Sequence, residues 1–216
     1  MPRWLLPAMA LLLVVAAGAS FMLAKGSGSS ANSNALPGGA REATPRDGLL
    51  GTLALPARAA PPIELRNYLG QHVSLASYRG KVVYVTFLYT HCPDVCPLIA
   101  SNLRVALNQL GPRARNVQMI AVSVDPRGDT PAAVAKFLRA HEMSGRMQYL
   151  IGSGTQLAST WAAWNVGSSR EVGHPDLVAH SALVYGISAK GTLTTIYPAS
   201  FEPSEIAHDT SVLAAK

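Results

Sequence analysis

The segment KVVYVTFLYTHCPDVCP, residues 81–97, joins an apolar run to the only two cysteines of the chain, Cys92 and Cys96. Its first half is β-branched and aromatic, which predicts a buried strand over residues 81–88. Apolar residues then recur at helical spacing as far as Gly111-Pro112, which predicts a helix that ends there. The cysteines therefore lie on a strand-to-helix turn, where free backbone N–H groups and the helix dipole favour thiolate over thiol.

Two cysteines four positions apart can close a disulfide or hold a soft metal ion. A purely structural disulfide is disfavoured, because it would close a very short loop, and short loops give little stabilisation. A chain of 216 residues, half of them apolar, also has enough material for a core without a crosslink. The pair therefore predicts a redox or metal site.

The composition argues against a nucleic-acid-binding protein. The formal net charge is +6, but five of the eighteen basic residues precede residue 60. The sequence has no dense block of Lys and Arg with interleaved aromatic residues, which is the pattern that nucleic-acid binding favours.

The N-terminal segment from Trp4 to Ala24 is nearly all apolar. A run of about 20 apolar residues is long enough to span a bilayer, so we expect a membrane anchor over residues 1–25. A cleavable secretory signal is the alternative, because Ala17-Gly18-Ala19 offers a cleavage site. Both alternatives send the rest of the chain out of the cytoplasm, where a reactive cysteine pair meets oxidants.

The remaining chain divides into a linker and one α/β domain. Residues 26–60 are rich in Gly, Ser, Ala and Pro and predict a flexible linker. Strand and helix patterns then follow from residue 61 to residue 216. The expected strands are a hairpin over residues 63–75, single strands over 81–88, 117–124 and 148–151, and a hairpin of strands 181–187 and 193–197. The expected helices are one that ends at 110, one from Asp129-Thr130-Pro131 to about 141, one over 155–165 and one over 204–214. This order predicts a thioredoxin-like fold with a central mixed sheet flanked by helices.

His180 begins the expected late strand, whose apolar part extends over residues 181–187. In a thioredoxin-like sheet the start of that strand lies beside the N-terminus of the cysteine helix, so two thiolates and one imidazole would converge. Such a set suits Cu(I), and sulfur-rich ligation also admits Cu(II). Zinc would need a fourth ligand, and the chain has no third cysteine. His91 and His174 are weaker candidates for the same site.

These motifs resemble the Sco/SenC family, membrane-tethered thioredoxin-fold proteins of cytochrome c oxidase assembly. The resemblance extends over about residues 61–214. The segments that carry it are Phe87-Leu-Tyr-Thr-His-Cys-Pro-Asp-Val-Cys-Pro97, Ser123-Val-Asp-Pro126 with Asp129-Thr-Pro131, and His180-Ser181.

The resemblance implies that Cys92, Cys96 and His180 bind copper, as Cu(I) and also as Cu(II), and that the two cysteines form a redox pair. It implies a copper chaperone, or thiol-disulfide metallochaperone, for the binuclear copper centre of cytochrome c oxidase. The implied partners are the copper-site subunit of a haem-copper oxidase, other periplasmic copper chaperones and thioredoxins. The implied location is the bacterial cytoplasmic membrane, with the domain facing the periplasm or the cell exterior.

Three features depart from the family pattern, and one is the altered spacing of the arginine before Asp129-Thr-Pro131, where Arg127-Gly128 stands. The family usually has an acid immediately before the ligand histidine and a tyrosine four residues before it, whereas Ala179 and Asp176 stand here. An acid at the first position can orient the imidazole or attract a cationic partner, and Ala179 can do neither.

Functions without a chaperone role remain open. A general thiol-disulfide oxidoreductase would attack with Cys92 and resolve with Cys96, although such enzymes usually have two residues between their cysteines. A peroxidase of the peroxiredoxin type is disfavoured, since Tyr89 and Val85 occupy the positions where it needs Thr and Pro. A copper or redox sensor fits the same residues as a chaperone does.

Overall fold

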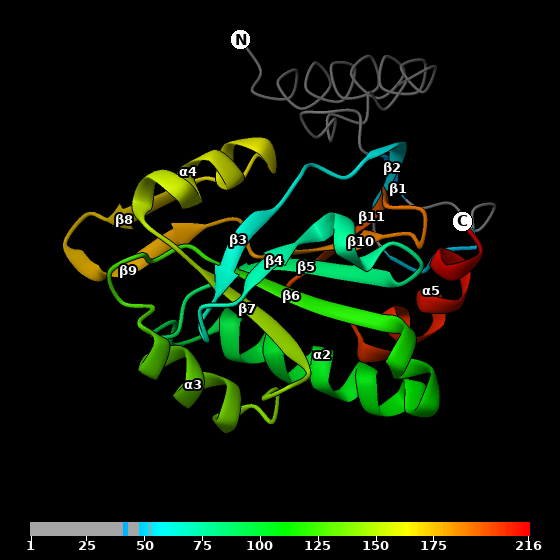
Figure 1. Ribbon diagram of the computed structural model, residues 1–216, viewed down its shortest axis with the longest axis horizontal. Coiled ribbons are helices and arrows are strands. Elements are labelled where there is room, and N and C mark those ends of the chain that lie inside the picture. Colours follow the sequence, from blue (N-terminus) through cyan, green and yellow to red (C-terminus); the bar gives the residue numbers. More distant parts are fainter. Residues whose placement is uncertain (1–40, 43–47, 52) are drawn as a thin grey trace, which may run out of the picture. The chain divides into compact units, whose positions relative to one another are not determined.

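The computed structural model describes residues 41–42, 48–51 and 53–216. These residues form a mixed β-sheet with helices on both faces (Figure 1), in agreement with the predicted α/β class. No helix within these ranges is long and apolar enough to cross a membrane. The expected anchor, residues 1–25, lies outside the described residues.

Nine strands of the described chain form the main sheet. In spatial order they are β1 (Arg41–Glu42), β2 (Leu53–Ala59), β11 (Thr192–Pro198), β10 (Leu183–Ile187), β5 (Val82–Leu88), β6 (Val117–Ser123), β7 (Met147–Ile151), β3 (Glu64–Asn67) and β4 (His72–Ser74). The pairs β5–β6 and β6–β7 are parallel, and the other pairs are antiparallel. The sheet is therefore parallel at its centre, where the connections run through helices.

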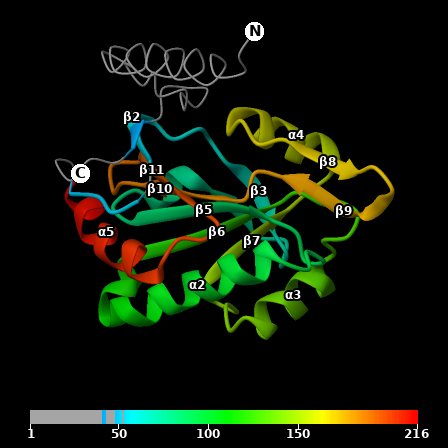
Figure 2. The ribbon, with the colours of Figure 1, turned by 180° about the vertical axis from the view of Figure 1, so that it is seen from behind.

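The helices α2 (Val95–Leu110) and α3 (Pro131–Ala140) make the two crossovers between the parallel strands. Right-handed crossovers in the same direction along a sheet place both helices on one face. The helix α5 (Pro203–Ala215) lies beside α2 on that face, and α4 (Gly154–Ala163) lies on the other face (Figure 2). Two short 3₁₀ helices, η2 (Leu75–Tyr78) and η3 (Gly111–Asn116), complete the connections.

The central strand β5 carries the cysteine loop at its C-terminal end. All seven of its residues are buried, because it has a strand on each side and helices on both faces. The buried side of α2, which includes Ile99, Leu103 and Leu107, packs in the same core. The turn between β5 and α2 is thus fixed at both ends by buried elements.

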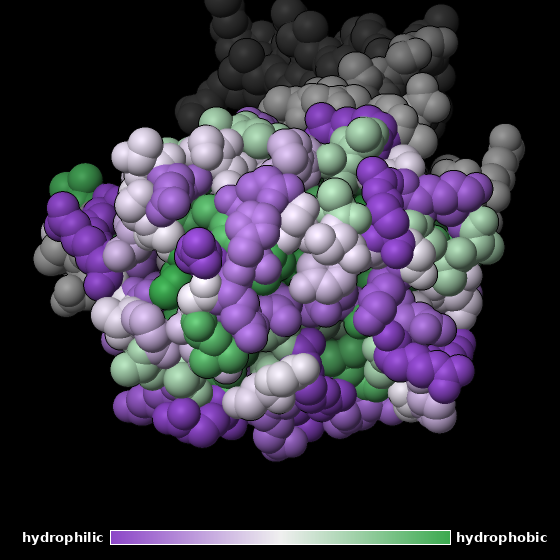
Figure 3. Space-filling view, viewed as in Figure 1, coloured by the Kyte–Doolittle hydropathy of each residue, from purple (hydrophilic) through white to green (hydrophobic). Residues whose placement is uncertain are grey.

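The surface is chemically mixed. Figure 3 shows hydrophilic side chains dispersed among apolar ones over one face. Among the described residues, the large apolar side chains that are exposed lie on separate elements: Leu50, Leu69, Leu98 and Val172. Scattered exposure of this kind is normal and does not by itself mark an interface.

The folded region begins before residue 61, where the sequence pattern places the start of the domain. Leu53–Ala59, expected in the linker, forms β2 and pairs with β11. The register of this pair shifts between Leu193 and Thr195, and β2 contains Pro56, which has no N–H group for a regular ladder. Upstream, the N–H groups of Leu50 and Gly51 donate to the two carboxylate oxygens of Asp209 on α5.

A second difference concerns the segment that leads to His180. Residues expected to be a loop form a separate two-stranded hairpin of β8 (Ser168–Glu171) and β9 (His174–His180). His180 therefore ends β9 and does not open β10, which starts at Leu183. The expectation was wrong because the strands SSRE and HPDLVAH lack the apolar alternation that marks a half-buried strand.

Candidate metal centre

The two cysteines lie at the junction of β5 and α2, as the sequence predicts. Cys92 is in the turn and Cys96 is in the first turn of the helix. Both are free thiols, Cys92 with 8% of its surface exposed and Cys96 with none. A partner molecule therefore reaches Cys92 before it reaches Cys96.

The N-terminus of α2 directs a backbone N–H group at sulfur. Asp94 is the N-cap residue, but its side chain makes no capping hydrogen bond. Instead the N–H group of Cys96 donates to the Sγ atom of Cys92 at 3.4 Å. The Cys92 sulfur thus takes the place of the usual capping oxygen, and the positive end of the helix dipole favours its negative charge.

The two thiols have opposite acidities. A hydrogen bond from the Cys96 thiol, helped by the N–H groups of Asp94 and Cys96 and by the Tyr89 hydroxyl, lowers the pKa of Cys92 to about 5 against the effect of burial. The same hydrogen bond to Cys92, followed by burial, raises the pKa of Cys96 above its usual value. At neutral pH the pair therefore holds one thiolate, on Cys92, and one proton, on Cys96.

This assignment predicts the pH dependence of alkylation. Because the thiolate is the nucleophile, the rate at Cys92 should fall as the pH drops through about 5 and be flat above pH 7. An ordinary cysteine, with a pKa near 8.5, would instead react about fifteenfold faster at pH 8.5 than at pH 7. Iodoacetamide labelling of the reduced protein, with each site quantified by mass spectrometry, measures both cysteines. A Cys92 rate that keeps rising to pH 8.5 would contradict the assignment.

His180 faces the second cysteine. Its Nε2 atom lies 3.8 Å from the Sγ atom of Cys96, and its Nδ1 atom lies 3.3 Å from the backbone oxygen of Ser181. Burial lowers the pKa of His180, which favours the neutral imidazole. When Nδ1–H donates to the Ser181 oxygen, the Nε2 lone pair points toward the cysteines, which is the tautomer that coordinates a metal.

The separation of Cys96 and His180 fits two ligands of one ion. In zinc sites sulfur and imidazole nitrogen lie about 2.3 Å and about 2.1 Å from the metal, which places the two ligand atoms about 3.6–3.8 Å apart. Within the described ranges, no three His, Cys, Asp or Glu side chains are already assembled as a cation site. The contacts present are pairwise, from Cys92 to Cys96 and from Cys96 to His180.

The weaker histidine candidates do not join this arrangement. His91 is exposed, and its Nδ1 atom lies 3.1 Å from the hydroxyl oxygen of Thr90. His174 belongs to β9, but its side chain and that of Asp176 are outside the described part of the structure. Ala179, which replaces the family's acid, is exposed next to His180.

Tyr89 is a site residue that the sequence pattern does not single out. Its ring packs edge-on against the His180 ring with centroids 5.7 Å apart, and its hydroxyl group helps to lower the pKa of Cys92. Burial raises the pKa of Tyr89 to about 12, so the hydroxyl stays a neutral donor. Its position directly after β5 was the available signal, because the last side chain of a buried strand often faces the site at the strand's end.

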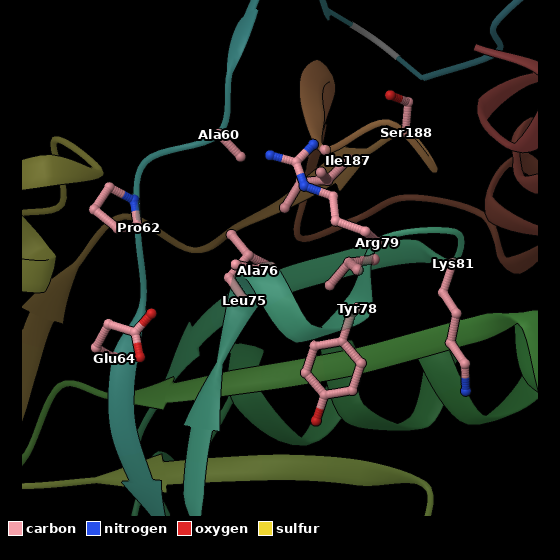
Figure 4. Close-up of a pocket in the computed structure, with 12 residues that line it drawn as sticks. Ala60, Pro62, Glu64, Leu75, Ala76, Tyr78, Arg79, Lys81, Ile187 and Ser188 are labelled. Carbon is pink, nitrogen blue, oxygen red and sulfur yellow. The ribbon is translucent and has the colours of Figure 1, made fainter.

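A separate cavity lies away from this centre. It measures about 160 Å³ and is lined by residues of η2, of the start of β5 and of the β10–β11 turn, including Tyr78, Lys81 and Ser188 (Figure 4). The cysteines follow the opposite end of β5, and none of the lining residues is a cysteine or histidine. The cavity therefore does not belong to the candidate metal centre.

Comparison with known proteins identifies related chains. The curated "Protein SCO2 homolog, mitochondrial" of Bos taurus is 33% identical over 138 residues, which cover 62% of this chain and 51% of that protein. "Protein SenC" of Rhodobacter capsulatus is 30% identical over 159 residues, which cover 73% of this chain and 71% of that protein. The chain thus spans about half the length of the mitochondrial relatives that it matches.

Solved structures agree with this relationship. Copper-bound ScoI of Bradyrhizobium japonicum is 29% identical, with a TM-score of 0.64, and the match covers 71% of this chain and 98% of that one. Apo Sco1 of Thermus thermophilus is 30% identical, with a TM-score of 0.60, covering 77% of this chain and 96% of that one. The sheet and its helices therefore have the thioredoxin-like Sco fold. The family described as SCO1/SenC matches residues 52–215, and this chain belongs to that family.

Proposed function

We propose that this protein is a copper chaperone that binds copper through Cys92, Cys96 and His180 and serves the binuclear copper centre of cytochrome c oxidase. The observation that carries the proposal is the 3.8 Å separation of the Cys96 Sγ and His180 Nε2 atoms beside the Cys92 thiolate. Membership in the SCO1/SenC family and the relative solved with copper bound support it.

The ligand set suits a metal that must be taken up and released. Two sulfur donors and one neutral imidazole prefer Cu(I) and also admit Cu(II). Cys92 and His180 are both partly accessible, whereas Cys96 is fully buried. A partner's ligands can thus displace the outer donors first, so that copper, the cargo, passes over one ligand at a time.

Thiol-disulfide exchange is a second candidate function, favoured by the low pKa of Cys92. The Cys92 thiolate would attack a partner disulfide, forming a mixed disulfide and releasing one partner thiolate. Cys96, after losing its proton, would then displace the second partner sulfur, which leaves Cys92 and Cys96 oxidised and the partner reduced. Repeated turnover of a disulfide substrate with a chemical reductant, in copper-free protein, would favour this function over a chaperone role.

The proposed partner is the copper-site subunit of a haem-copper oxidase, with periplasmic copper chaperones and thioredoxins as further partners. The proposed location is the bacterial cytoplasmic membrane, anchored through residues 1–25, with the domain on the periplasmic or outer side. An anchor would raise the effective concentration of the domain near an oxidase in the same membrane. A mature N-terminus near Ser20, found by mass spectrometry of protein recovered without detergent, would contradict the anchor.

The test of the copper proposal is an anaerobic titration of the reduced, full-length protein in detergent. We expect one copper per chain, because the cysteines supply one thiolate pair and His180 one imidazole. X-ray absorption should then count two sulfur neighbours and one nitrogen neighbour. Binding near two ions per chain, or none after full reduction, would contradict the proposal.

A further inference from the structure

Two buried aspartates flank the loop that follows β6, residues 125–129, which we call the acidic loop. Asp125 and Asp129 each have 4% of their surface exposed. A buried carboxylate is costly unless it is paired or hydrogen-bonded, so the partners of these side chains show what each one holds in place.

Asp129 holds the cysteine loop. Its Oδ1 atom accepts a hydrogen bond of 2.8 Å from the backbone N–H of Thr90, two positions before Cys92. Its Oδ2 atom accepts from the hydroxyl groups of Ser123 at 2.6 Å and Tyr149 at 3.0 Å. One carboxylate therefore ties the cysteine loop to β6 and β7.

Asp125 holds the hairpin that carries His180. Its Oδ1 atom accepts a hydrogen bond of 2.7 Å from the guanidinium Nη2 of Arg170 on β8. Arg170 pairs in register with Val178, two positions before His180 on β9. A second tie runs from the Ser168 hydroxyl to the backbone oxygen of Val124, at 3.0 Å.

The acidic loop is closely packed between these two attachments. A Cβ atom at Gly128 would lie only 2.3 Å from Asp125 Oδ2 and 3.2 Å from His91 Nδ1. The absence of a side chain at Gly128 thus lets the loop approach both the Asp125 carboxylate and the cysteine loop. The hairpin otherwise forms its own small sheet, outside the main one, as Figure 1 shows.

We propose that the acidic loop is a brace that sets the distance between the two halves of the copper site. Asp129 fixes the cysteine loop, and the ion pair of Asp125 with Arg170 fixes the hairpin so that His180 stays beside Cys96. Arg170 and Asp125 are therefore positioning residues for the imidazole ligand. The inference rests on the proposed function in one respect, that His180 ligates copper.

The brace acts differently on the two oxidation states. Two thiolates can hold Cu(I) without the imidazole, whereas Cu(II) depends on a harder nitrogen donor. Breaking the ion pair removes one of the ties that hold the hairpin, while the Ser168 hydrogen bond and the Asp129 contacts of the cysteine loop stay intact. Loss of Arg170 should therefore weaken Cu(II) binding and leave Cu(I) binding nearly unchanged.

The test compares four variants of the full-length protein. Arg170→Gln removes the ion pair, and Arg170→Lys keeps the charge but loses the guanidinium geometry. Arg127→Gln is the matched control, since Arg127 is exposed on the same loop and its loss changes the net charge equally. His180→Ala shows the effect of losing the imidazole altogether. Cu(II) and Cu(I) affinities, pulsed EPR of histidine nitrogen coupling, and hydrogen exchange of the copper-free protein are measured for each.

We expect Arg170→Gln to lower Cu(II) affinity about tenfold to a hundredfold, the usual effect of losing a group that orients a ligand. Its nitrogen coupling should weaken toward that of His180→Ala, and amides of residues 168–180 should exchange faster than in the parent while those of α2 do not. Arg170→Lys should fall between the parent and Arg170→Gln, and Arg127→Gln should match the parent.

If folded Arg170→Gln has the same Cu(II) affinity and the same nitrogen coupling as the parent protein, the proposal that the acidic loop is a brace is wrong. If Arg170→Gln does not fold, Arg170→Lys decides in its place, and parental values there would overturn the brace equally. If the parent protein binds no copper, the proposed function fails, but hydrogen exchange still decides the brace. Unchanged exchange over residues 168–180 in the copper-free variants would then overturn it.

Discussion

Replacing either Cys92 or Cys96 with serine should abolish tight copper binding. Structural zinc sites with four ligands bind with about 10–16 kcal/mol, or about 2.5–4 kcal/mol per ligand. Loss of one thiolate should therefore weaken affinity by a factor of about one hundred to one thousand. Serine is close in size to cysteine, but its hydroxyl stays protonated at neutral pH and is a poor ligand for soft Cu(I).

Competition with a chelator of known Cu(I) affinity measures the loss in each variant. His91→Ala is the control, because His91 adjoins Cys92 but is exposed and is hydrogen-bonded to the Thr90 hydroxyl. It should bind copper as the parent does. Thermal unfolding separates lost ligation from lost folding, which matters most for the fully buried Cys96. Either serine variant binding copper within tenfold of the parent, while folded, would exclude that cysteine as a ligand.

Much of the fold follows from local patterns in the sequence. The strand expected over residues 81–88 is β5 (Val82–Leu88), and the helix expected to end before Gly111 is α2. The helix start expected at Asp129-Thr130-Pro131 is also confirmed, since Thr130 caps α3 with its hydroxyl group. These elements were predictable because their own residues carry the apolar period, the caps and the stop signals.

The elements that the sequence missed depend on partners far along the chain. The strand β2 contains a proline and pairs with β11, more than 130 residues later. The β8–β9 hairpin has few apolar residues. It is held by the ion pair of Arg170 with Asp125 and by the hydrogen bond from the Ser168 hydroxyl to the Val124 backbone oxygen. Local composition favours a linker or loop in both places, and only long-range pairing overrides it.

The candidate site, like the fold, was predictable only where local sequence carries the signal. The cysteine pair at a strand-to-helix turn carries its own signal, and the structure confirms that turn. His180 does lie next to Cys96, although from the end of β9 rather than the start of β10. Tyr89 and Asp125 lie in segments that the sequence motifs mark, but their contacts with His180 and Arg170 join separate elements, and no spacing in the sequence reveals these contacts.

The state of the cysteine pair should decide whether any copper binds at all. A disulfide has neither a thiolate to donate nor an ionisable thiol, and His180 alone is one ligand. Protein oxidised to the Cys92–Cys96 disulfide should therefore take up no copper at Cu(I) concentrations that saturate the reduced protein. Conversely, bound copper occupies the sulfur lone pairs. It should therefore protect both cysteines from alkylation and prevent them from attacking an external disulfide.

The experiment adds Cu(I) anaerobically to oxidised and to reduced protein, and then treats the oxidised sample with dithiothreitol. Cu(I) is used because Cu(II) can itself oxidise two thiolates and would blur the starting state. Metal analysis after desalting should give near zero for the oxidised protein and about one copper per chain once it is reduced. Oxidised protein that loads copper as fully as reduced protein would show that the metal binds elsewhere. The thiol pair at the start of α2 would then serve disulfide exchange alone, as the low pKa of Cys92 already permits.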